Sequence, residues 1–183
     1  MNKFKRNYMI KMKDIVLEGA NILRKKLKEV PFPLTNEDKG NLVCMLNFLK
    51  NSQDPIMAEK HKLRAGVGLS ANQIGLNKRM FVMYIDGKEY ILINPKIISH
   101  SINIVHLPDG EGCLSVNRDI LGYVPRYERI KISAYNIDGE IITHCFSEYE
   151  AIVAQHEFDH LNGIMFYDKI NKSNPFELPK SGI

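Results

Sequence analysis

The stretch QHEFDHLNG, residues 155–163, constrains this chain more than any other part of its sequence. It places two histidines four residues apart, with a glutamate directly after the first. Residues four apart share one face of an α-helix, so His156 and His160 can direct two imidazoles at one metal ion. The alternative is a pair of ordinary core or surface histidines. The motif favours a metal site carried by a helix.

The helix that would carry this motif has signals at both of its ends. Ser147 and Glu150 have the spacing of a capping box, in which each side chain hydrogen-bonds the backbone N–H of the other residue. Gly163 suits the left-handed conformation that commonly follows a last helical turn. The sequence therefore predicts a helix between these signals.

A second helix is predicted earlier in the chain. Thr35 can cap it together with Asp38, three residues on, and leucines then recur at helical spacing. The Asp54-Pro55 pair predicts its end. The recurring leucines are Leu42, Leu46 and Leu49.

From residue 78 onward the chain changes to short runs rich in β-branched and aromatic residues. Turn signals such as Asp86-Gly87, Pro108-Asp109-Gly110 and Asp138-Gly139 separate these runs, which predicts antiparallel strands and hairpins. The runs are RMFVMYI, YILINPKII, INIVHL, RIKISAYNI and EIITHCF. Cys145, in the last run, is expected to pack as a small hydrophobic residue. The closing residues 172–183 contain two prolines and predict an extended tail.

The composition sets the broad class of protein. A chain of 183 residues, 44% hydrophobic and 25% charged, predicts one soluble globular domain over residues 1–183 and argues against a disordered or fibrous chain. Three scattered cysteines suit a reducing cytoplasm better than a disulfide framework. We find no stretch long enough for a membrane span and no secretory signal.

The charge balance points to no particular partner. The net charge is +4, and RKKLKEV, residues 24–30, is the densest basic stretch. It is interpreted first as a solvated surface, with contact to an anionic partner such as RNA as the alternative. The residues support no sequence-specific recognition of nucleic acid.

A catalytic metal needs further groups besides two histidines. Glu157 is rotated about 100° around the helix from His156, which suits a base better than another ligand. Cys113, in GEGCLS, offers a thiolate next to glycine, although an ordinary buried cysteine is the simpler interpretation of that residue alone. In AGVGLSANQIG, residues 65–75, two glycines leave the backbone open to close approach, and Gln73 offers an amide donor.

In this order and at this spacing, GVGLSANQ, EGCLS and QHEFDHLNG resemble the three signature motifs of the peptide deformylases. The resemblance runs from MKDI to GIMFYDKI, and the second and third motifs match fully. The first departs from the usual GxGLAAPQ, with Ser70 for alanine and Asn72 for proline, which makes the loop more polar and removes a rigid φ. The helix-rich insertion between Leu34 and Lys62 resembles the type 2 branch of Gram-positive bacteria.

The resemblance implies an α+β fold with small antiparallel β-sheets packed around a central metal-ligand helix that carries HExxH. It also implies that Cys113 joins His156 and His160 as the third metal ligand, with water in the fourth position. One divalent metal ion is expected, Fe(II) being the physiological one, although zinc, nickel or cobalt can occupy such a site.

The implied activity is that of a hydrolase that removes the N-formyl group from N-formylmethionine of newly synthesised peptides and releases formate. Metal-activated water would attack the formyl carbon, with Glu157 as general base and then acid. Gln73 and the backbone N–H of Leu114 would stabilise the oxyanion.

The resemblance further implies which residues bind the peptide. The substrate would lie extended beside Gly66, Val67 and Gly68, with Val67 and Gly68 supplying backbone hydrogen bonds in the manner of an added strand. Methionine would enter an apolar pocket near the ligand helix, formed by Tyr149, Ile152 and Val153. The expected partners are nascent formylmethionyl peptides, with a transient ribosome contact and no membrane.

Two other hypotheses remain open from the sequence. An ordinary HExxH metallopeptidase would need a third ligand downstream of the motif, where Asp168 and Glu177 are the carboxylates. A non-catalytic relative would keep the metal as a structural element, which the polar substitutions Ser70 and Asn72 alone support.

Overall fold

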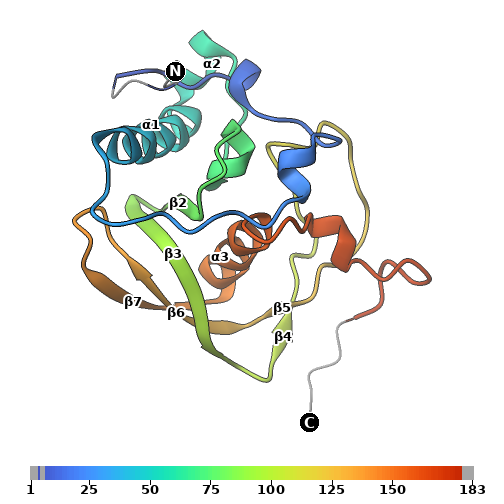
Figure 1. The fold of residues 1–183 in the computed structure, drawn as a ribbon. Coiled ribbons are helices and arrows are strands. Elements are labelled where there is room, and N and C mark those ends of the chain that lie inside the picture. The colour runs from blue at the N-terminus through green and yellow to red at the C-terminus, as the bar shows by residue number, and fades with distance from the viewer. Residues whose placement is uncertain (1–3, 5–6, 179–183) are drawn as a thin grey trace.

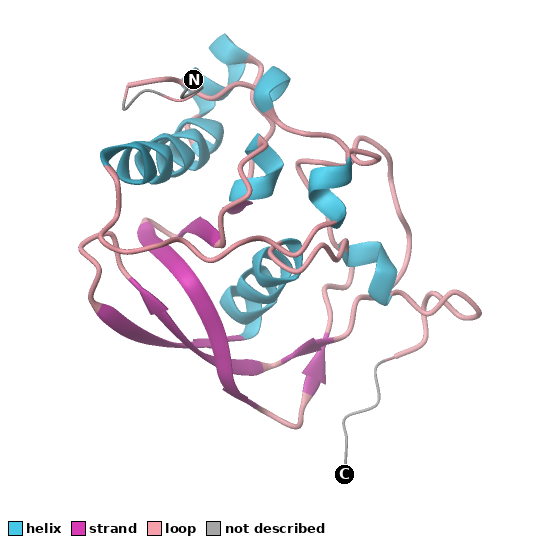
Figure 2. Ribbon diagram, in the orientation of Figure 1, coloured by secondary structure: helices cyan, strands magenta, loops and turns pink. Residues whose placement is uncertain are grey.

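The computed structural model describes Phe4 and residues 7–178 (Figure 1). Within them, three α-helices and two antiparallel sheets form an α+β fold, which agrees with the predicted class. The larger sheet has the strand order β1-β2-β3-β6-β7, and β4 pairs with β5. Figure 2 shows the strands in magenta and the helices in cyan. The helices are α1 (Asn36–Gln53), α2 (Pro55–His61) and α3 (Glu148–His160). The strands are β1 (Gly68–Ser70), β2 (Met80–Ile85), β3 (Lys88–His100), β4 (Ile104–Val105), β5 (Arg126–Tyr127), β6 (Arg129–Tyr135) and β7 (Ile141–Ser147).

Strand β2 holds the two halves of the core together. Its side chains alternate between the two faces of the sheet, as those of any strand do. Met80 and Val82 belong to the core cluster that contains α1, whereas Phe81 and Met83 belong to the cluster that contains α3. The two helices therefore cover opposite faces of β2.

The predicted hairpins are confirmed. Asp86 and Gly87 join β2 to β3 with φ values of 49° and 78°, the left-handed pair that matches the twist of antiparallel strands. Gly139, at φ 85°, lies in the turn between β6 and β7. The expectation for Cys145 is wrong, because side chains alternate along β7 and this thiol is on the exposed face.

The capped helix before residue 54 is also confirmed. The Asp38 N–H donates to Thr35 Oγ1 at 3.1 Å, and the Thr35 N–H donates to Asp38 Oδ2 at 3.3 Å. The helix ends at Gln53, and Asp54 caps α2, which begins at Pro55.

The capping box predicted at the start of α3 is wrong. Ser147 is the last residue of β7, and its side chain makes no capping hydrogen bond. The chain passes from strand to helix through Glu148, which has a φ of 50° and donates its N–H to the Glu128 carbonyl at 2.8 Å. The Glu150 carboxylate accepts instead from the Tyr90 hydroxyl at 3.0 Å. Hydrogen bonds with Glu128 and Tyr90, which are distant in sequence, therefore take the place of a local cap.

The other end of α3 is as predicted. Gly163 has a φ of 74°, and its N–H donates to the His160 carbonyl, while the Ile164 N–H donates to the Asp159 carbonyl. This pair of bonds is a Schellman motif. A Cβ on Gly163 would lie 2.6 Å from the Arg24 carbonyl carbon, so the position requires glycine for packing as well.

The predicted tail lies partly outside the described residues. Residues 172–178 form turns with neither helix nor strand, and 179–183 lie outside the description. Across the described part of the chain, no helix is long and apolar enough to cross a membrane.

Candidate metal centre

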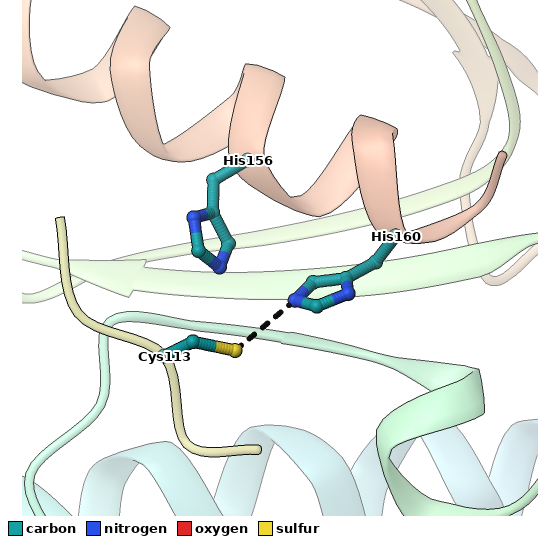
Figure 3. A group of neighbouring side chains, drawn as sticks. All are labelled: Cys113, His156 and His160. Atoms are coloured by element: carbon teal, nitrogen blue, oxygen red, sulfur yellow. Dashed lines mark hydrogen bonds between the residues drawn. The ribbon is translucent and has the colours of Figure 1, made fainter. Parts of the chain in front are cut away.

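Three side chains from two distant parts of the chain meet beside α3. His156 and His160 project from successive turns of the helix, and Cys113 comes from the loop after β4 (Figure 3). One potential ligand atom from each residue lies within 4.8 Å of the others, and Cys113 Sγ is 3.3 Å from His160 Nε2. Bond lengths of about 2.3 Å to sulfur and about 2.1 Å to nitrogen in a tetrahedral site separate those atoms by about 3.6 Å. The donor set and its spacing therefore fit one divalent metal ion.

His156 is oriented by a carboxylate that the sequence analysis did not single out. Its Nδ1 lies 2.9 Å from Glu111 Oε2, which leaves Nε2 for the metal. Glu111 in turn accepts two hydrogen bonds from Arg126, at 2.7 and 2.8 Å. Burial opposes the ionised form of Glu111, but the hydrogen bonds and charges of Arg126 and His156 prevail and lower its pKa to about 2. Glu111 is therefore ionised at neutral pH behind His156.

Arg126 connects this anion to the ligand helix. Its side chain is fully buried on β5, and it also donates to Asp159 on α3, to which Lys169 lies 3.0 Å away. A buried arginine between two carboxylates is compensated on both sides. The sequence offers only a weak indication of Glu111, which is its position two residues before Cys113. Arg126 lies in a run without any motif, so nothing in the sequence indicates its role.

The loop that presents Cys113 is held by an arginine. Arg64 Nη2 donates to the Cys113 carbonyl at 2.8 Å, and Nη1 donates to the Val116 carbonyl at 3.1 Å. These two bonds fix the backbone on both sides of the turn that carries the thiol.

Glu157 lies next to the ligands but on another side of the helix. It is 3% exposed, and burial raises its pKa to about 7 against the opposing charge of His156. A Cβ on Gly68 would lie 2.4 Å from Glu157 Oε1, so the missing side chain at position 68 makes room for the carboxylate. Its Oε2 has no hydrogen-bond partner within the described residues. The Glu157 carboxyl group is thus buried, its pKa lies near neutral pH, and its Oε2 is available to a ligand.

Gln73 is held with its amide nitrogen toward the ligand loop. Its Oε1 accepts the Ser70 N–H at 2.9 Å, and its Nε2 lies 3.2 Å from Ser115 Oγ and 3.4 Å from Cys113 Sγ. The N–H of Leu114 meets no acceptor in the described part of the chain. Both donors that the sequence analysis named are therefore near the ligands.

A cavity of about 380 Å³ opens beside this group. His160 does not line it and lies deeper, 1% exposed. The other residues that the deformylase resemblance implies for the site line the cavity: Gly66, Val67, Gly68, Gln73, Cys113, Leu114, Tyr149, Ile152, Val153, His156 and Glu157.

The downstream carboxylates considered for a metallopeptidase are engaged elsewhere. Asp168 pairs with Arg24 and accepts the Met165 N–H at 2.8 Å. Glu177 accepts from Asn171. Neither belongs to the cluster of potential ligands.

Comparison with known proteins agrees with the site. Residues 12–176 match the model of the polypeptide deformylase family. The chain is 52% identical over 176 residues to peptide deformylase 2 of Bacillus anthracis, covering 93% of this chain and 96% of that protein. It is 50% identical over 184 residues to peptide deformylase of Enterococcus faecalis, covering 96% and 98%. The crystal structure of the Thermotoga maritima peptide deformylase superposes with a TM-score of 0.75 at 32% identity, covering 90% of this chain and 99% of that one.

An α+β fold that gathers a thiol, two imidazoles and a buried carboxylate around a cavity defines a metal-dependent hydrolase. The chain belongs to the polypeptide deformylase family. Its similarity to the Bacillus and Geobacillus proteins called peptide deformylase 2 supports the type 2 branch. Its activity is the metal-dependent removal of N-formyl groups.

Proposed function

We propose that this site removes the formyl group from N-formylmethionyl peptides with Cys113, His156 and His160 as ligands of one divalent ion. The observation that carries the proposal is the buried carboxylate of Glu157 in the cavity that Cys113 and His156 also line, with His160 completing the group of three potential ligands. A bound divalent cation supplies Lewis-acid chemistry, which lowers the pKa of water and polarises a carbonyl oxygen.

Glu157 is the proton carrier in this proposal. A general base works best when its pKa is near the working pH, and burial brings the pKa of Glu157 to about 7. Its carboxylate takes a proton from the attacking water and then delivers it to the nitrogen of the departing amine. Formate and a free N-terminus result, and the carboxylate is regenerated.

Gln73 and Leu114 stabilise the negative charge that develops on the formyl oxygen. The Gln73 amide is fixed through its Oε1, so its Nε2 does not need to reorganise during the reaction. The Leu114 N–H has no acceptor in the described residues to compete with a substrate. One such donor typically contributes about 3 to 4 kcal/mol to transition-state stabilisation.

The peptide binds along the open edge of the larger sheet. β1 is an edge strand, so one side of its backbone is free for an added strand. The Val67 carbonyl already accepts the Tyr84 N–H at 2.9 Å, and groups on neighbouring residues of a strand point to opposite edges. Gly68 therefore directs its N–H and carbonyl outward, while Gly66 and Val67 shape the adjoining wall.

The methionine side chain occupies the apolar part of the cavity. Tyr149, Ile152 and Val153 line this part from α3, one to two turns before the first ligand. Tyr149 is 44% exposed, so a bound methionine would bury surface that is open without substrate.

The wider setting follows from the same proposal. We infer that residues 1–183 form a single deformylase domain and that α3 is its central element. Fe(II) is the proposed physiological ion, with zinc, nickel or cobalt as substitutes. The proposed location is the cytoplasm, where nascent chains would be met in a transient contact with the ribosome.

The test is formate release from formyl-Met-Ala-Ser by protein purified anaerobically and loaded with Fe(II), with Cys113→Ala treated identically. We expect turnover in the parent and loss of both metal and turnover in the variant. A parent that contains one metal ion per chain but releases no formate would contradict the proposal. Acetyl-Met-Ala-Ser serves as the control for cleavage of ordinary amide bonds.

A further inference from the structure

Two residues of the first motif, Ser70 and Asn72, are completely buried and hydrogen-bonded, and the Ser70 hydroxyl also hydrogen-bonds the Glu157 carboxyl group. Asn72 Nδ2 donates to the His160 carbonyl at 2.7 Å, across 88 positions of sequence. A carbonyl can only accept, so the amide nitrogen must face it and Oδ1 must face away. This contact fixes the orientation of the Asn72 side chain.

The orientation of the Asn72 side chain determines which atom of Asn72 faces the Ser70 hydroxyl. The Ser70 hydroxyl lies 2.8 Å from Asn72 Oδ1 and 3.2 Å from Gln73 Oε1. Both amide oxygens are acceptors, and the shorter distance favours the bond to Asn72 Oδ1. The Ser70 N–H meanwhile holds Gln73 Oε1 at 2.9 Å, which turns the Gln73 nitrogen toward Cys113 and Ser115. A continuous set of bonds therefore runs from the end of α3 to the amide beside the thiol.

We propose that Ser70 and Asn72 act as one positioning unit, which sets the Gln73 amide and the His160 end of α3 relative to each other. Neither side chain touches substrate, and the inference rests on the proposed role of Gln73. Removing the Ser70 hydroxyl leaves Asn72 Oδ1 buried without a donor. Removing the Asn72 amide leaves the His160 carbonyl with only the Gly163 N–H, at 3.2 Å. The connection between Gln73 and the end of α3 is therefore complete only when both side chains are present.

The experiment compares Ser70→Ala, Asn72→Ala and the double variant. Groups that orient metal ligands typically change activity or metal affinity about 10- to 100-fold when removed. We expect each single variant to lower kcat by about that factor with KM little changed, since substrate contacts are kept. The double variant should be no worse than the poorer single variant, because it leaves no unpaired acceptor.

Cobalt-substituted protein gives a readout that does not depend on turnover. We expect both single variants to alter the visible Co(II) absorption spectrum and to release cobalt to a chelator about 10-fold or more faster than the parent. Thr35→Ala, which removes a helix cap on α1, is the matched control. It should lower Tm by about 2 to 4 °C without changing the spectrum, the release rate or kcat.

The two proposals fail in different ways. A metal-loaded parent without formate release would contradict the proposed function, while the cobalt spectra would still decide the positioning role. Variants with the spectrum, cobalt release and kcat of the parent, and a Tm loss like that of Thr35→Ala, would overturn the positioning role. Multiplicative effects of the two substitutions on kcat would overturn the claim that they act as one unit. If Asn72→Ala does not fold, Ser70→Ala alone tests the positioning role, because it removes only one hydroxyl group and is expected to fold.

Discussion

Helices α1 and α3 cover opposite faces of β2, but they are stabilised in different ways. α1 has a complete capping box and buries a run of apolar side chains, among them Leu42, Met45 and Leu49. α3 has no side-chain cap, and its last two turns bury four polar side chains, three of which bond to residues at least 28 positions away. These groups are Gln155, Glu157, Asp159 and His160. α1 also buries Asp38, which pairs with the distant Lys78, but its cap is local and most of its buried side chains are apolar, whereas α3 has no local cap.

The first way to test this comparison is to remove a distant partner of α3. Arg126→Met keeps the bulk of the side chain but leaves Glu111 and Asp159 buried without their counter-charge. Breaking a buried ionic group in this way costs on the order of 3 to 5 kcal/mol. We expect that loss in the free energy of unfolding, measured by urea titration of metal-free protein.

The control is an exposed arginine that also forms a bidentate pair. Arg118 is 59% exposed and pairs with Glu18 on the surface. Arg118→Met should leave the unfolding free energy within error of the parent, because water screens the pair. Equal losses for the two variants would contradict a special dependence of α3 on buried charge.

The second test uses pH on the same charge group. A carboxyl group with a depressed pKa stabilises the fold above its unfolded value, and that stability is lost as pH falls through the folded value. For Glu111 the pKa falls from 4.5 to about 2, which corresponds to about 3 kcal/mol lost between about pH 5 and pH 2. Urea titrations of the metal-free parent and of Glu111→Gln over this range measure the free energy of unfolding. As the pH falls, this free energy should decrease more steeply in the parent than in the variant. Parallel curves would contradict the assigned role of Glu111 as a buried anion.

A third and smaller effect is expected at the cap of α1. Thr35→Ala removes the side chain that accepts the Asp38 N–H, and such caps contribute about 1 kcal/mol. The loss should appear in the unfolding free energy of the metal-loaded protein, while kcat is unchanged. A change in kcat would show that α1 and α3 are not independent.

The smallest effect is expected at the matching residue of α3. Ser147 makes no capping hydrogen bond, so Ser147→Ala should leave the unfolding free energy and Tm unchanged within error. A loss as large as that of Thr35→Ala would mean that Ser147 caps α3 in solution and would remove the contrast between the two helices.

The same contrast explains how far the sequence could predict the structure. The strands of the hairpins, the capped α1 and the glycine after α3 depend on neighbours a few residues away, so their signals are local. The Ser147 cap was predicted wrongly because Glu148 turns the chain directly out of β7. Arg126 lies 15 positions from Glu111 and 33 from Asp159, and no local pattern encodes such pairs.

The side chains of the candidate site are easier to predict from the sequence than the contacts that hold those side chains in place. The residues that offer ligand atoms, His156, His160 and Cys113, are marked by short motifs, and the fold brings them together. Their supporting contacts depend on tertiary structure. The bond from Asn72 to the end of α3, for example, has no trace in either motif considered alone.

The central claim is that α3 carries two of the three proposed metal ligands and the proton carrier, and that binding metal and transferring the proton are separable functions. The most direct test measures metal content and formate release together in Glu157→Gln loaded anaerobically with Fe(II). We predict one metal ion per chain, as in the parent, with formate release lowered about 100- to 10,000-fold, the range expected for loss of a general base. A metal-replete variant that retains substantial turnover would contradict the role of Glu157, and loss of the metal would contradict its separation from the ligands.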